Sequence, residues 1–70
     1  MKKYFVEIYD DMEDTTILQS KPTRSKEKAL KFFEDIFFIE VNMKAMLLSG
    51  DFDKDGNLND CDIIVEENLN

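Results

Sequence analysis

The chain has 70 residues, of which 43% are hydrophobic and 36% are charged. This composition predicts one small folded domain over residues 1–70. Sixteen acidic residues against nine basic ones give a formal net charge of -7, which disfavours direct binding to a nucleic-acid backbone. The sequence contains no histidine, so the commonest general base and transition-metal ligand is missing and we expect no enzyme activity.

The first third of the chain carries the pattern of a β-hairpin. Residues 3–9, KYFVEIY, alternate between two faces with the period of two that a half-buried strand requires. The acidic segment DDMED at 10–14 is typical of a turn, and TTILQS at 15–20 is short and β-branched. These features predict a hairpin over residues 3–20.

An amphipathic helix is predicted next. Pro22 ends the strand, and Ser25 is a good N-cap for a helix that begins at Lys26. At 100° per residue the apolar positions form one arc, which predicts a core-facing surface. The members of this arc are Ala29, Leu30, Phe32, Phe33, Ile36 and Phe37. Phe38 falls on the polar side, so either it is an exposed anchor or the helix ends near Phe37.

Two interpretations remain for the middle of the chain. Residues 41–48 alternate in the manner of a strand, but a single helix over 26–48 followed by a calcium-type loop also fits, because MKAMLLSG consists of good helix formers. Residues 62–67, DIIVEE, predict a final strand. With the strand interpretation the order is β-β-α-β-β. This order gives an α+β fold, a four-stranded antiparallel sheet with the helix packed on one face.

In this arrangement the sheet face away from the helix carries large apolar side chains. They are Phe5, Tyr9, Met46 and Leu48. An exposed patch of this kind is typical of a partner-binding surface, and a homodimer through the open face is one form that it could take.

The segment DFDKDGNLNDCD at 51–62 has the spacing of a calcium-binding loop. Such a loop takes oxygen ligands from its first, third, fifth, seventh and twelfth positions and has glycine at the sixth. The corresponding ligands are Asp51, Asp53, Asp55, Asn57 and Asp62. The stretch resembles the loops of EF-hand proteins and, with aspartate at position twelve, those of dockerin modules. The resemblance implies a calcium or magnesium site, whereas the Asp-Gly pair and the strand signals around the loop favour an acidic hairpin connection.

Charge is distributed unevenly along the predicted path. The β-β-α-β-β order places the basic start of the helix beside the acidic loop 51–57. It leaves the opposite end with no basic neighbour to compensate its acids. These acids are Asp10, Asp11, Glu13, Asp14, Glu66 and Glu67.

These six acids predict a module that docks on a basic partner protein, such as the nucleic-acid groove of a host protein. In size and composition the chain resembles the inhibitor proteins of bacteriophages and mobile elements, including DNA mimics and anti-defence proteins. The alternative function is a divalent-cation-binding domain. Cys61 is the only cysteine and no stretch approaches the length of a membrane span, so a cytoplasmic location without membrane association is expected.

Overall fold

The structure is a computed structural model that describes residues 1–36 and 43–69. Four strands and one helix follow one another as β1 (Lys2–Asp10), β2 (Thr15–Gln19), α1 (Lys26–Ile36), β3 (Met43–Phe52) and β4 (Leu58–Leu69). The predicted α+β order β-β-α-β-β is therefore confirmed. No helix in the described ranges has the length and apolar character needed to cross a membrane.

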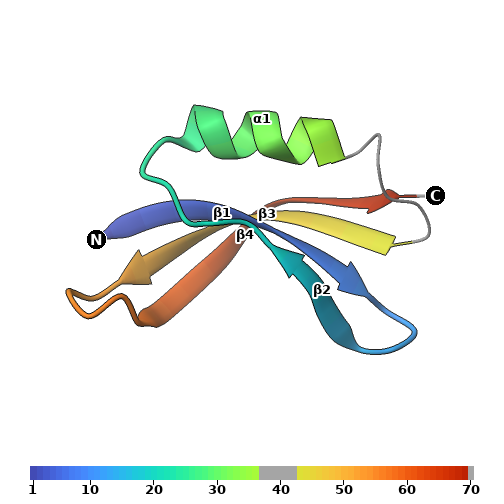
Figure 1. Ribbon diagram of the computed structural model, residues 1–70, viewed down its shortest axis with the longest axis horizontal. Coiled ribbons are helices and arrows are strands. Elements are labelled where there is room, and N and C mark those ends of the chain that lie inside the picture. The colour runs from blue at the N-terminus through green and yellow to red at the C-terminus, as the bar shows by residue number, and fades with distance from the viewer. Residues whose placement is uncertain (37–42, 70) are drawn as a thin grey trace.

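The strands form one antiparallel sheet in the order β2-β1-β3-β4, and α1 packs on one face over the two central strands. Figure 1 shows the helix above the sheet. The N-terminus, the start of α1 and the β3–β4 turn lie toward the left. The β1–β2 turn, the end of α1, the start of β3 and the end of β4 lie toward the right (Figure 1).

The competing prediction of one helix over 26–48 is wrong, because residues from Met43 onward belong to β3. Residues 43–48 of the predicted strand 41–48 lie in β3, which continues to Phe52, whereas residues 41–42 lie outside the described residues. The final strand begins at Leu58, four residues before its predicted start. The connection between β3 and β4 is thus confined to 53–57, since pairing with the neighbouring strand outweighs the weak strand propensity of aspartate and glycine.

The helix begins where the sequence predicts. The backbone nitrogen of Lys28 donates to the Ser25 hydroxyl at 3.2 Å, and this bond satisfies one of the free donors at the helix start. Ala29, Phe33 and Ile36 are buried against the sheet. The prediction was wrong for the flanks of the apolar arc, as Leu30 and Phe32 are 36% and 40% exposed.

The reason for this difference is the width of the layer that the helix covers. The helix-side core is built from the central strands, with Val6 and Ile8 from β1 and Ala45 and Leu47 from β3 all at most 1% exposed. Leu18 on β2 faces the same side, opposite Ile8, but remains 40% exposed. A single helix covers about two strands, so the edges of its apolar arc project past the core. Phe37 and Phe38 lie outside the described residues.

A second core lies on the sheet face away from the helix. Phe5, Met46, Leu48 and Phe52 form one cluster, and Tyr9 packs against it. The predicted face is therefore right, but the prediction that these side chains form an exposed patch is wrong. Their exposed fractions are 1% for Phe5, 8% for Met46 and 6% for Leu48, and Tyr9 is half-buried.

Sheet twist explains this burial. The sheet is twisted, so that its two hairpins turn away from the helix (Figure 1). On the open face the side chains pack into one cluster. The Phe5 and Phe52 rings meet edge to face with centroids 6.0 Å apart. Gly50 leaves room on this open face for Leu58, because a Cβ at this position would lie 2.5 Å from Cδ1 of Leu58. The domain thus has two small cores, one on each side of the sheet.

Candidate functional site

Charged side chains are divided unequally between the two ends of the molecule. The β1–β2 turn, the last turn of α1, the start of β3 and the end of β4 lie toward the right in Figure 1. By sequence these segments, 10–14, 33–36, 43–45 and 66–69, hold eight acidic residues and one basic residue, Lys44. We call this group the acidic end: Asp10, Asp11, Glu13, Asp14, Glu34, Asp35, Glu66 and Glu67. The other described residues hold seven acidic and eight basic side chains, whose formal charges nearly cancel. The net negative charge of the described chain is therefore concentrated at the acidic end.

Half of these acids lie at the end of β1 and in the turn that follows it. The Asp10 carboxylate accepts hydrogen bonds from the backbone nitrogens of Met12 at 2.9 Å and Glu13 at 3.3 Å. Asp14 has a φ of 53°, a left-handed conformation that aspartate tolerates better than most residues. The side chains of Asp11, Glu13 and Asp14 are exposed, so the turn directs them into solvent.

The end of the helix adds negative charge that the sequence prediction missed. Glu34 and Asp35 lie in the last turn of α1, which contains no basic residue. The helix macrodipole is itself negative at this end, so both carboxylates oppose local helix stability. The predicted order β-β-α-β-β already places the end of the helix at the same end of the molecule as the β1–β2 turn. This order could therefore have identified Glu34 and Asp35 as further acids there.

One basic side chain does reach the acidic end, so the prediction that nothing basic lies there is wrong. The Lys44 Nζ lies 3.6 Å from Asp11 Oδ1, 3.7 Å from Glu66 Oε1 and 5.6 Å from the Tyr9 ring centroid. Lys44 is opposite Tyr9 in the pairing of β1 with β3, which brings it between the β1–β2 turn and β4. Lys44 is half-buried but both carboxylates are exposed, and surface pairs contribute only about 0 to 1 kcal/mol each. One lysine compensates one of eight acids.

The five predicted metal ligands are distributed over two strands and a turn. Asp51 is in β3, where its carboxylate accepts a hydrogen bond from the Met1 amino group at 2.9 Å. Asp55 and Asn57 are in the turn, and Asp62 is in β4 opposite Ser49. In the described part of the chain no group of three or more acidic, cysteine or histidine side chains is arranged to hold a metal ion.

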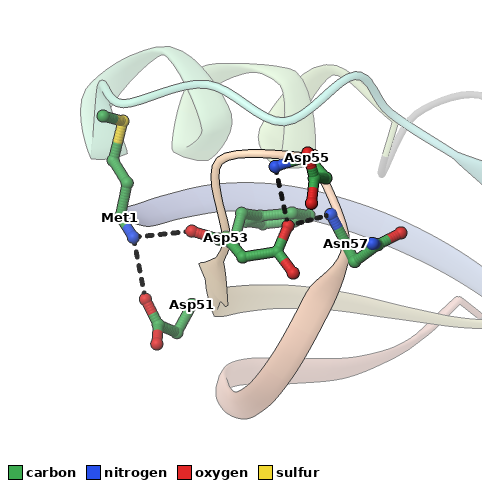
Figure 2. Close-up of polar contacts among 6 residues, drawn as sticks. Met1, Asp51, Asp53, Asp55 and Asn57 are labelled. Carbon is green, nitrogen blue, oxygen red and sulfur yellow. Dashed lines mark hydrogen bonds and ion pairs between the residues drawn. The ribbon is translucent and has the colours of Figure 1, made fainter.

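Asp53, the fifth predicted ligand, organises the turn. Figure 2 shows its carboxylate bonded to the backbone nitrogens of Asp55 and Asn57, each at 2.9 Å. The Asp53 backbone is bonded to Asn57 and Gly56, and Gly56 has a φ of 85° that favours glycine. The hydrogen bond from the Asn57 backbone is the main cause that lowers the pKa of Asp53 from 3.8. The segment is therefore an acidic hairpin connection, as the Asp-Gly pair predicts.

The lowered pKa of Asp53 gives a prediction for stability at acid pH. The ionised carboxylate is favoured in the folded state, so its contribution is present above about pH 3.8 and is lost as the pH falls through the folded pKa. Asp53→Asn keeps an acceptor oxygen but cannot ionise. We expect the Tm, measured by circular dichroism, to fall less between pH 5 and pH 2 for this variant than for the wild type. Asp55→Asn is the control, as its side chain accepts neither bond, and equal acid sensitivity in both variants would contradict the assignment.

The basic start of the helix and the acidic hairpin lie together, as predicted. Arg24, Asp53 and Lys54 line one pocket at the left-hand end of the molecule, with Lys3 and Phe52. Charges of both signs are interspersed here, in contrast to the acidic end.

Comparison of the chain with protein-family models, curated proteins and solved structures found no match.

Proposed function

We propose that the protein is a small acidic interaction module that docks through its acidic end on a basic, nucleic-acid-binding surface of another protein. The observation that carries this proposal is the segregation of charge: eight acids and one lysine at one end, and nearly balanced charges elsewhere in the described residues. Acidic residues that served only for solubility would be expected over the whole surface.

The acidic end has properties that suit it to this role. Its carboxylates come from the β1–β2 turn, the last turn of α1 and the end of β4, which lie toward the same end of the molecule (Figure 1). Carboxylates and phosphates are bound by the same arginine and lysine side chains, which makes a group of carboxylates on a folded domain a competitor for nucleic acid. A concentrated negative field also accelerates encounter with a basic partner. A DNA mimic or anti-defence inhibitor would use the acidic end in this way.

Two variants of equal net charge test whether position or total charge matters. The first, Asp11→Asn, Glu13→Gln and Asp14→Asn, removes three charges from the acidic end. The second, Glu27→Gln, Asp51→Asn and Asp55→Asn, removes three exposed charges from elsewhere. The probe is a fluorescent peptide of ten lysines, and the measurement is anisotropy at low salt. We expect the first variant to weaken binding about tenfold more than the second, because three exposed pairs are lost at the docking surface.

Salt dependence provides the accompanying measurement. Exposed charges are screened beyond about 8 Å at physiological ionic strength, so wild-type binding should weaken steeply with added salt. Equal affinities for the two variants would show that net charge alone attracts the peptide, and the proposal would then be wrong. Circular dichroism of both variants checks that each keeps the fold.

A further inference from the structure

Strand β4 leaves one edge of the sheet open. It is 12 residues long and is the last strand in the order β2-β1-β3-β4, so nothing pairs with its outer side within the described residues. The opposite edge, β2, has only 5 residues. An open edge presents a row of backbone donors and acceptors that another strand can use.

The centre of this edge is apolar and exposed. Ile63 is 54% exposed and Ile64 is 37% exposed, and both are β-branched residues that favour strand pairing. Edge strands are commonly protected by lysine or proline, and β4 contains neither. Its pairing with β3 is irregular at two places. One lies at Ile64, between the pairs Leu48–Ile63 and Leu47–Val65, and the other at Asn59, between the pairs Phe52–Leu58 and Asp51–Asp60.

Charge determines which strand this edge can accept. The four ionisable carboxylates of β4 flank the isoleucine pair on both sides, and no basic residue accompanies them. They are Asp60, Asp62, Glu66 and Glu67. Pairing of β4 with a second copy of itself would set acidic segments against each other, which is unfavourable. A strand with basic residues around an apolar centre would instead be complementary.

We propose that β4 binds an extended basic segment of the partner protein as a fifth strand of the sheet. The backbone hydrogen bonds would provide affinity, Ile63 and Ile64 would contact apolar side chains, and the flanking carboxylates would select lysine and arginine. This inference rests on the proposed function, since it specifies how a basic partner is held. Glu66 and Glu67 belong to both the acidic end and β4, so the two contacts are continuous along one strand.

A pair of peptides separates strand pairing from simple charge attraction. The probe is a capped ten-residue peptide of alternating lysine and valine, and its control has the same sequence with every inner amide N-methylated. Both carry the same charge and side chains, but the control cannot donate backbone hydrogen bonds. We expect the unmodified peptide to bind at least about tenfold more tightly in anisotropy measurements, because several hydrogen bonds are lost together in the control. Amide hydrogen exchange should slow in 58–67 only with the unmodified peptide.

Two matched protein variants locate the edge that is used. Ile63→Lys on β4 and Ile17→Lys on β2 change residues that are 54% and 51% exposed, and each adds one positive charge. We expect Ile63→Lys to weaken binding of the unmodified peptide about fivefold or more, and Ile17→Lys to have little effect. Both exposures are high enough for the folded state to be retained, which circular dichroism verifies.

The outcomes distinguish this inference from the proposed function. Equal affinity for the two peptides, or equal effects of the two isoleucine variants, would overturn strand addition. The proposed function would still stand if the acidic-end variant alone lost its binding to the lysine peptide. If instead the matched charge variants behave alike while N-methylation and Ile63→Lys abolish binding, strand addition holds and the acidic end is not the docking surface.

Discussion

Replacing Phe5 with alanine is expected to unfold most of the protein at 37 °C. Phe5 is 1% exposed and belongs to the second core on the open face of the sheet, where its ring packs edge to face against that of Phe52. Removing a buried phenylalanine costs about 3 to 5 kcal/mol, because both the apolar contacts and the filled volume are lost. A domain of this size has a total stability on the order of 3 to 10 kcal/mol.

Urea unfolding followed by circular dichroism measures this effect. Met12→Ala is the control, since the Met12 side chain is 95% exposed in the β1–β2 turn and should contribute almost nothing. A change of less than about 1 kcal/mol for Phe5→Ala would mean that the open face is not a core, and would restore the interpretation of an exposed partner surface.

The second large effect is expected on the helix. Phe33 is 5% exposed and packs against both central strands, whereas the adjacent Phe32 is 40% exposed at the margin of the layer. Phe33→Ala should therefore lower the free energy of unfolding by about 3 to 5 kcal/mol, and Phe32→Ala by about 1 kcal/mol or less. The two substitutions remove the same atoms from neighbouring positions of one helix, so helix propensity changes equally.

Chemical denaturation of the two variants side by side gives the comparison. Equal losses would show that the helix is rotated relative to the sheet, with both rings in the core. A larger loss for Phe32→Ala would contradict the orientation of α1 described above.

Local sequence patterns were sufficient to predict the element order. The period of two in residues 3–9, the N-cap at Ser25 and the Asp-Gly pair each depend on neighbours in the chain, and each is realised. The limits of β3 and β4 could not be predicted in the same way. Whether Gly50 and Asp51 join a strand depends on β1 alongside them, which is a tertiary contact.

The burial of the open face could not be read from periodicity either. Alternation correctly assigned Phe5, Met46 and Leu48 to one side of the sheet. Their exposure, however, depends on the twist of the sheet and on Leu58 folding over Gly50. These are properties of the assembled hairpins, and no single strand sequence contains them.

The acidic end was predicted in part. Six of its carboxylates follow from the two acidic segments at the ends of predicted strands. Glu34 and Asp35 are not among the predicted acids, although the direction of the predicted helix places them at the same end. The contact of Lys44 with these acids was not predicted. The alternation of residues along β3 indicates on which face of the sheet Lys44 lies, but not that the β1–β2 turn brings Asp11 close to it.

If the protein docks through its acidic end, a basic ligand binds there and not wherever negative charge is present. The most direct measurement is a titration of the isotopically labelled protein with the ten-lysine peptide, followed through the amide signals of each residue. We expect the largest changes at residues 10–14, at the end of α1, and at Glu66 and Glu67. Changes that are largest in the hairpin at 53–57, or that are spread evenly over all acidic segments, would contradict docking through the acidic end.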